Sequence, residues 1–263
     1  MVLSMADPSH LGRLNYASLS TQTLMEIFIE GIENREVICG STEEPDDIDQ
    51  WKGLAYSPEE LDDSTEKYLS IEWFDINLLG TIDLQWLPPV VRSLGIYDRE
   101  LSGSLNLTAL PPSIQWLILE NNAFSGEIDL CHLPVDIKML SLSRNQLSGS
   151  LNLDQLPQSI HTLYLNTNRF SGTVSFRNLP LNLQSLKLNN NELSGVIDLT
   201  RLPVVMMHLW LDQNNFEGKT DFSRLPEGLQ ELGVSYTDLA GEITVQNRTT
   251  LFYVQHSNVE LIR

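Results

Sequence analysis

Hydrophobic and polar positions alternate along most of this chain in a pattern that recurs every 23 residues. Within each unit an apolar residue stands at positions 1 and 3, with variable residues around it, as at Leu163 and Leu165. Alternation of this kind is typical of a strand that buries one face. Successive units place at position 1 Ile71, Leu94, Leu117, Leu140, Leu163, Leu186, Leu209 and Leu232.

Two further ladders keep the same period. Glycine recurs at position 10, from Gly80 to Gly241, and proline at position 18, from Pro88 to Pro226. The units therefore run from residue 71 to about residue 254 without an insertion or deletion. Self-similarity at a fixed period indicates a solenoid. Because the unit is too short for a long helical return, the stacked strands must run parallel.

Written as a consensus, each unit reads L-x-L-x-x-N-x-L-S-G-x-I-D-L-x-x-L-P-x-S-I, as in the unit that begins at Leu140. This pattern resembles the leucine-rich repeats over about 180 of the 263 residues. The L-S-G-x-I part resembles plant-type repeats, and the length and continuation resemble repeats of protist proteins. The resemblance implies an α/β repeat solenoid, shaped as a horseshoe or arc, with a parallel sheet on its concave face and short strands and turns on its convex side. It also implies protein binding without catalytic residues.

Other positions predict how each unit turns. Position 8 is apolar, and positions 12 and 14, such as Ile197 and Leu199, predict a second short strand on the return limb. Proline after the leucine at position 17 ends regular pairing, because proline lacks the donor that a strand needs. Position 6 is asparagine in five units, and we expect its amide to satisfy backbone groups of the turn. The five are Asn122, Asn145, Asn168, Asn191 and Asn214.

Position 13 holds Asp or Asn in most units, including Asp83, Asp129, Asp198 and Asp221. A row of carboxylates could suggest cations, but neutral residues stand between them, so we predict turn-stabilising side chains and no metal site.

Residues 1–70 do not repeat and are predicted to form an N-terminal cap; residues 71–254 form the repeat domain and residues 255–263 an end segment. Ser20 or Thr21 could begin a helix that reaches about Ile32. Its apolar stripe of Leu24, Ile27, Phe28 and Ile32 would cover the end of the repeat core, which a solenoid must shield from water. The acidic stretch at 43–47 is predicted to be a solvated loop. The sequence Trp51-Lys52-Gly53-Leu54 resembles the cap that precedes plant-type repeats.

Acidic residues outnumber basic ones 35 to 16, which gives a formal charge of -19. So negative a surface repels nucleic acid and anionic membranes and favours a basic protein surface as partner. Cys39 and Cys131 make neither a disulfide scaffold nor a metal knuckle, and no secretory signal is visible. These features predict an intracellular, cytoplasmic protein that is monomeric in isolation. No catalytic or cofactor motif is found, and Cys131 beside His132 is expected to be a packing residue.

Residues at positions 2 and 4, and the residue before position 1, must point out of the core onto the concave face. Aromatic residues at such places are typical of interface anchors. The candidate partner-binding residues are Tyr97, Trp116, Ile118, Glu120, Met139, Tyr164, Lys187, His208, Trp210 and Asp212. The sequence thus predicts a non-enzymatic adaptor or scaffold. The alternative is a structural subunit of a large assembly, whose convex face and caps would also be buried.

Overall fold

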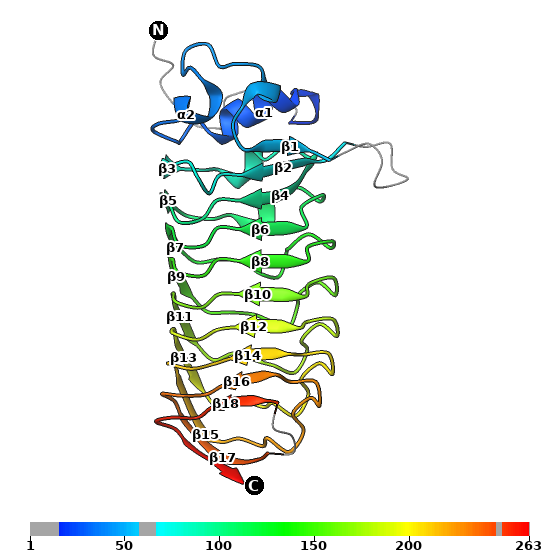
Figure 1. The fold of residues 1–263 in the computed structure, drawn as a ribbon, viewed down its shortest axis with the longest axis vertical. Coiled ribbons are helices and arrows are strands. Elements are labelled where there is room, and N and C mark those ends of the chain that lie inside the picture. Colours follow the sequence, from blue (N-terminus) through cyan, green and yellow to red (C-terminus); the bar gives the residue numbers. More distant parts are fainter. Residues whose placement is uncertain (1–15, 58–66, 246–248, 263) are drawn as a thin grey trace.

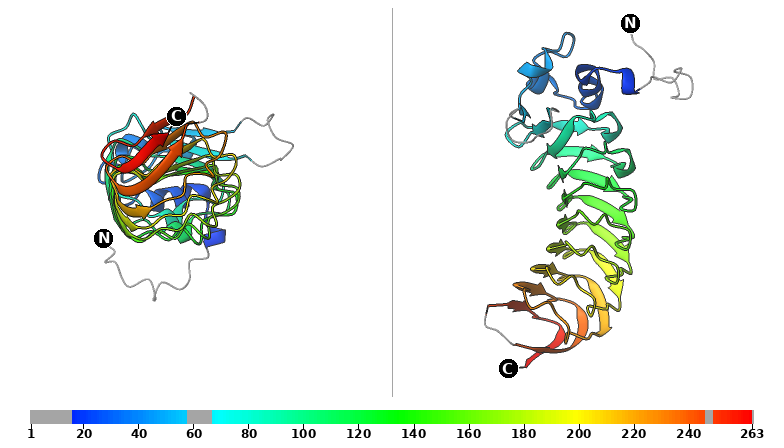
Figure 2. Two further views of the ribbon diagram at one scale, coloured as in Figure 1. Left: turned by 90° about the horizontal axis from the view of Figure 1, so that it is seen from below. Right: turned by 90° about the vertical axis from the view of Figure 1, so that its right-hand side faces the viewer.

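The computed structural model describes residues 16–57, 67–245 and 249–262. Its chain winds into a stack of short coils, and each coil contributes one strand to each of two sheets (Figure 1). The stack bends toward the outward side of the ten-stranded sheet, which therefore forms the concave face (Figure 2). The predicted arc of parallel strands is confirmed.

The ten-stranded sheet follows the position 1–3 ladder. Its strands, in spatial order, are β1 (Leu54–Tyr56), β2 (Leu69–Glu72), β4 (Val91–Gly95), β6 (Trp116–Ile118), β8 (Met139–Ser141), β10 (Thr162–Tyr164), β12 (Ser185–Lys187), β14 (His208–Trp210), β16 (Glu231–Gly233) and β18 (Leu251–Tyr253). All pairs are parallel except β1 with β2, which is antiparallel. Register keeps the repeat exact, since Leu163 lies beside Leu140 and Leu186.

The second sheet has nine strands. They are β3 (Leu79–Thr81), β5 (Glu100–Gly103), β7 (Ala123–Gly126), β9 (Gln146–Gly149), β11 (Arg169–Gly172), β13 (Glu192–Gly195), β15 (Asn215–Lys219), β17 (Asp238–Thr244) and β19 (Asn258–Ile262).

The position of this second strand differs from the prediction. Strand β13 ends at Gly195, so Ile197 and Leu199 lie after it rather than within it. Both side chains are buried, as their alternation suggested. Between them, however, Asp198 accepts a hydrogen bond from the Thr200 amide at 3.0 Å, and this tight turn ends the extended backbone. The alternation of apolar residues therefore predicted the burial of these side chains correctly, but it did not predict that they lie outside the strand.

The asparagines at position 6 connect neighbouring coils by hydrogen bonds. Asn145 Nδ2 donates to the carbonyl oxygens of Leu119 at 2.9 Å and Leu142 at 3.0 Å, and its Oδ1 accepts from the Phe124 amide at 3.1 Å. Asn122, Asn168, Asn191 and Asn214 repeat this arrangement. The structural role predicted for the ladder is confirmed.

The residue before each of these asparagines has a left-handed backbone, which the sequence did not reveal. Position 5 has a φ between 51° and 60° in every coil after the first, although none of its residues is glycine. This conformation turns the chain from one sheet into the other. It is unfavourable for a β-branched residue such as Thr167, whose φ is 58°.

The N-terminal cap contains α1 (Thr21–Phe28), α2 (Glu36–Cys39) and the short 3₁₀ turns η1 (Tyr16–Ser18) and η2 (Ile48–Gln50); two further turns, η3 (Leu84–Trp86) and η4 (Leu107–Ala109), belong to the first repeats. Ser20 caps α1 by accepting from the Thr23 amide at 3.1 Å, as predicted. The helix ends at Phe28, earlier than Ile32. Met25 and Ile29 are buried, while Ile27 is only half-buried.

The cap closes the N-terminal edge of both sheets. Strand β1 pairs with β2, and the Glu33 amide donates to the Leu79 carbonyl oxygen of β3 at 2.8 Å. The Phe28 ring stacks on Trp73, with ring centroids 6.1 Å apart. Gly53, with a φ of 73°, lies so close to the Glu72 carbonyl oxygen that no other residue fits. A continuous apolar core thus runs from α1 to the last coil.

Candidate functional site

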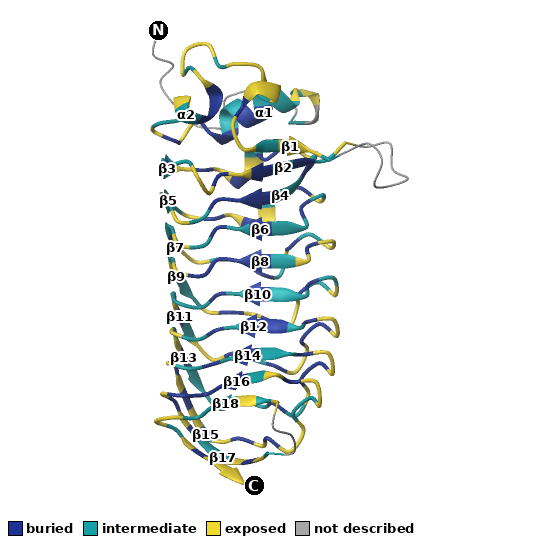
Figure 3. Cartoon of the chain, in the orientation of Figure 1, coloured by how far each residue is buried: buried dark blue, intermediate teal, exposed yellow. Residues whose placement is uncertain are grey.

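The concave face consists of the side chains that the ten-stranded sheet turns outward, at positions 2, 4 and 23 of each unit. All of the residues predicted for partner binding lie on it, and each is half-buried. Figure 3 shows half-buried stretches along strands β6, β10 and β14 of this sheet. They are Tyr97, Trp116, Ile118, Glu120, Met139, Tyr164, Lys187, His208, Trp210 and Asp212. Half-buried aromatic groups on an outward sheet face can be covered by a partner at little cost in polar desolvation.

Two aromatic residues extend this row and were missed by sequence reasoning. Phe74 stacks on Tyr97 with ring centroids 5.6 Å apart, and Tyr253 stacks on Trp210 at 5.0 Å. Phe74 stands at position 4 of the first unit, so the column itself could have revealed it. Tyr253 was missed because the last unit is shorter than 23 residues. Phe252 lies beside Leu232 in the sheet although it follows Leu232 by only 20 residues.

Two lysines cover aromatic rings in the middle of the face. The Lys138 ammonium lies 5.1 Å from the Trp116 ring centroid, and the Lys187 ammonium lies 4.5 Å from that of Tyr164. Each pair is a cation–π contact. The Tyr164 hydroxyl is also 3.2 Å from Ser185 Oγ, which fixes the ring on the sheet.

The carboxylates of the face are held by the protein itself. Glu120 Oε1 accepts a short hydrogen bond from the Ser141 hydroxyl. Glu231 Oε2 lies 3.1 Å from His208 Nδ1. Asp212 Oδ1 accepts from the Ser235 amide at 2.8 Å. None of these three groups is therefore fully available to a partner.

Asp212 is the most constrained of the three. Its carboxyl rests on Gly233, where the missing side chain leaves room for it. Burial raises the pKa of this carboxyl, although the bond from the Ser235 amide opposes the shift. Within the described residues, Asp212 Oδ2 and Trp210 Nε1 are both buried without a hydrogen-bond partner. The C-terminal part of the face therefore holds polar atoms whose hydrogen-bonding capacity is unused.

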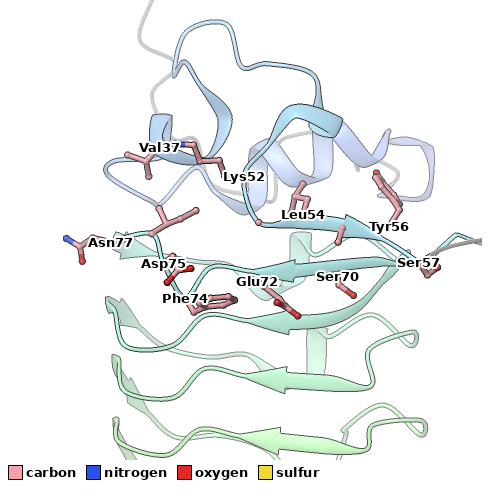
Figure 4. A pocket seen from close by; sticks show the side chains of 13 residues that line it. Val37, Lys52, Leu54, Tyr56, Ser57, Ser70, Glu72, Phe74, Asp75 and Asn77 are labelled. Atoms are coloured by element: carbon pink, nitrogen blue, oxygen red, sulfur yellow. The ribbon is translucent and has the colours of Figure 1, made fainter.

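A groove of about 890 Å³ continues the concave face toward the cap (Figure 4). It lies against β1 and β2, and Phe74 joins it to the aromatic row. Its polar lining includes Lys52, Glu72 and Asp75, of which both acidic residues are exposed. The acidic stretch at 43–47, predicted to be solvated, is exposed or half-buried in the cap above.

The Cys131–His132 pair shows no sign of a nucleophile. His132 Nδ1 lies 2.7 Å from Asp129 Oδ2, and Asp129 Oδ1 accepts from the Cys131 amide at 2.7 Å. Burial raises the pKa of the Cys131 thiol, which is opposite to what a reactive cysteine requires. Asp129 thus acts as the turn-stabilising residue that its column predicted.

The described residues hold no cluster of three or more His, Cys, Asp or Glu side chains that could bind a metal ion. None of the helices in that part of the chain has the length and apolar character needed to cross a membrane.

Comparison with models of known families gives no match, and comparison with curated proteins gives none either. Solved structures do match. Pollen Receptor Kinase 3 is 25% identical, with a TM-score of 0.53 over 75% of this chain and 93% of that one. The leucine-rich-repeat ectodomain of the plant receptor kinase GASSHO1/SCHENGEN3 from Arabidopsis thaliana, in complex with CASPARIAN STRIP INTEGRITY FACTOR 2, is 19% identical, with a TM-score of 0.53 over 91% of this chain and 36% of that one. A plant ice-binding protein is 19% identical, with a TM-score of 0.52 over 91% and 94% of the two chains. The fold is that of a leucine-rich-repeat solenoid, as the sequence predicted.

Proposed function

We propose that this chain is a non-enzymatic protein-binding module, an adaptor or scaffold, that holds its partner on the concave face. The observation that carries the proposal is the row of half-buried or exposed aromatic side chains from Phe74 to Tyr253, all on one side of one sheet. Tryptophan and tyrosine are the residues most often found as anchors of protein interfaces, where they bury a large area.

The dimensions of the face suit a protein partner. Ten strands at a spacing of about 4.8 Å give a length of roughly 43 Å, which accommodates an interface of standard size. A structurally similar ectodomain was solved in complex with a factor, which supports the same use of the fold here.

The partner's basic groups, expected from the net charge of -19, would meet the N-terminal part of the site. Glu72 and Asp75 in the groove are exposed, and the first 70 residues carry 15 acidic and 4 basic side chains. We also propose a cytoplasmic location, with which the presence of only two cysteines is compatible, and a monomeric state when the protein is alone.

The second candidate, a structural subunit of an assembly, is favoured by a different observation. Three of the residues at position 19, on the loops that lead into the ten-stranded sheet, form an exposed apolar ridge that Gln158 interrupts. Val135, Leu181 and Val204 are 76%, 74% and 83% exposed there. A subunit packed among neighbours would bury this ridge as well as the concave face.

Site-specific photo-cross-linking separates the two functions. A benzophenone amino acid is introduced at Thr162 in the centre of the concave face, at Ser171 in the nine-stranded sheet, or at Leu181 in the ridge. Cross-links that form in the producing cells from position 162 and not from the other two support the adaptor. Cross-links from position 181 at equal yield support the subunit, and cross-links from 171 or 181 without 162 contradict the concave-face proposal.

A further inference from the structure

The charge of the chain is unevenly distributed along the solenoid. Residues 138–191 contain five basic residues and one acidic residue, a net charge of +4, in a protein whose total is -19. The basic residues are Lys138, Arg144, Arg169, Arg177 and Lys187, and the acidic one is Asp154. A positive belt therefore surrounds the middle coils, between two acidic ends.

On the concave face, this belt has no carboxylate of its own. The outward positions of β8, β10 and β12 carry Lys187 together with hydroxyl, amide and apolar side chains. Lys138 and His161 directly precede β8 and β10, and the Lys138 ammonium reaches the face over the Trp116 ring. Among the described residues, neither lysine forms an ion pair, and each ammonium group lies only over an aromatic ring. A cation–π contact on a partly exposed ring leaves the other side of the ammonium group to solvent.

The adjoining acidic groups are in the opposite state. Glu120 is bound to Ser141, Glu231 lies beside His208, and Asp212 is bound to the Ser235 amide. A partner that approaches the centre of the face thus meets lysines without an ion pair, whereas each of the three nearby carboxylates already has one oxygen in contact with an internal polar group.

We infer that the centre of the concave face binds an extended acidic segment of a protein partner, whose carboxylates meet Lys138 and Lys187 while its apolar groups cover Trp116 and Tyr164. This inference rests on the proposed function and specifies which partner chemistry that site takes. The net charge of the whole chain predicts a basic partner, and that attraction belongs to the cap and the groove. Electrostatic complementarity at the centre would then fix which segment lies there and in which direction.

The spacing suits a short segment. Lys138 directly precedes β8 and Lys187 ends β12, so the two lie two strand spacings, or about 10 Å, apart along the stack and three residues, also about 10 Å, apart along the strand direction. An extended chain advances about 3.3 Å per residue, so two carboxylates about four residues apart span the resulting distance of about 14 Å. A ten-residue peptide in which Glu alternates with Ser offers carboxylates near both lysines.

The test is fluorescence anisotropy with this Glu peptide and with peptides that carry Gln or Lys at the same places. The salt concentration is about 0.15 M, so that the charges of acidic groups farther than about 8 Å from the bound peptide are largely screened. We expect the Glu peptide to bind the full chain more tightly than the Gln peptide. The double variant K138Q/K187Q should bind it at least tenfold more weakly.

The matched control is R169Q/R177Q, which changes the net charge equally but lies away from the concave face. Arg169 is the first residue of β11, and Arg177 forms an exposed ion pair with Asp198 at 3.6 Å. Affinity within twofold of wild type in this control is expected. The single variants K138Q and K187Q serve if the double variant does not fold.

Equal binding of the Glu and Gln peptides, or equal losses in both double variants, would overturn the inference. A Lys peptide that binds the wild type more tightly than the Glu peptide, and gains affinity in K138Q/K187Q, would do the same. These outcomes leave the cross-linking test from Thr162 unaffected, so failure of the acidic segment and failure of the concave-face proposal are distinguishable.

Discussion

Asn145 and Leu119 stand 26 residues apart, yet the asparagine side chain donates to the leucine carbonyl oxygen at 2.9 Å. The same amide group bonds to Leu142 in its own coil. Each asparagine of the ladder therefore joins one coil to the preceding one through backbone groups that would otherwise be buried without partners. The cohesion of the stack depends on these side chains as well as on the apolar core.

Asn145→Ala should lower the free energy of unfolding by about 3 kcal/mol, because each buried backbone group left unpaired costs about 1–3 kcal/mol. Urea denaturation followed by circular dichroism measures the change. The control is Asn182→Ala, an exposed asparagine that makes a single bond of 2.9 Å to the Gln158 carbonyl oxygen. Equal losses in both variants would show that the ladder has no special role.

Thr167→Asn should stabilise the protein by about 1 kcal/mol. Thr167 has a φ of 58°, a conformation that costs a β-branched residue more free energy than it costs asparagine. Asn121 and Asn190 already occupy the same position in other coils. A thermal melting temperature equal to or below that of the wild type would refute this account of position 5.

Phe28→Ala should destabilise the protein by about 3–5 kcal/mol, since the ring is fully buried against Trp73. Ile27→Ala in the same helix is the matched control, because Ile27 is only half-buried. The urea midpoint should be highest for the wild type, lower for I27A and lowest for F28A. A lower midpoint for I27A than for F28A would mean that α1 does not cover the core.

Asp212→Asn should raise the melting temperature at pH 7 by a few degrees. The asparagine keeps an oxygen for the Ser235 amide and removes the buried charge. Because burial raises the pKa of Asp212, its contribution to stability is present at low pH and is lost as the pH rises through the folded-state pKa.

The advantage of the variant should therefore shrink as the pH falls below about 4, where the unfolded aspartate is also protonated. The comparison is a series of thermal melts of both proteins between pH 3 and pH 7. An advantage that does not depend on pH would show that charge is not the cause.

The periodic part of the fold could be predicted because the same positions are buried in every unit. Leu163 lies beside the residue at the same position of the next unit, Leu186, so the 23-residue repeat also predicts which residues are neighbours in the sheet. Ile243 at position 12 does lie within β17, but residues such as Ile197 and Leu199 were misassigned as a strand because burial alternates both in a strand and across a tight turn. Only the Asp198–Thr200 hydrogen bond distinguishes the two, and it depends on backbone geometry.

The sequence predicted which residues lie on the concave face, but it did not predict which groups their charged side chains contact. Alternation places Lys187, Glu120 and Asp212 on one face, and all three are found there. What each charge contacts depends on neighbouring coils, 21 to 23 residues away in sequence, as for Glu120 with Ser141. The net charge of the chain gave no indication that Glu120, Glu231 and Asp212 contact internal polar groups, whereas Lys138 and Lys187 lie over aromatic rings.

Hydroxyl-radical footprinting of the protein, alone and with its cross-linked or co-purified partner, tests the concave-face account most directly. Tryptophan, tyrosine and methionine react readily with the radical, and the face carries Trp116, Met139, Tyr164 and Trp210 in a half-buried state. We expect oxidation of these residues to fall strongly in the complex, while oxidation of Leu181 and Val204 in the exposed ridge stays unchanged. Undiminished oxidation of the four concave-face residues, with protection of the ridge, would contradict the account.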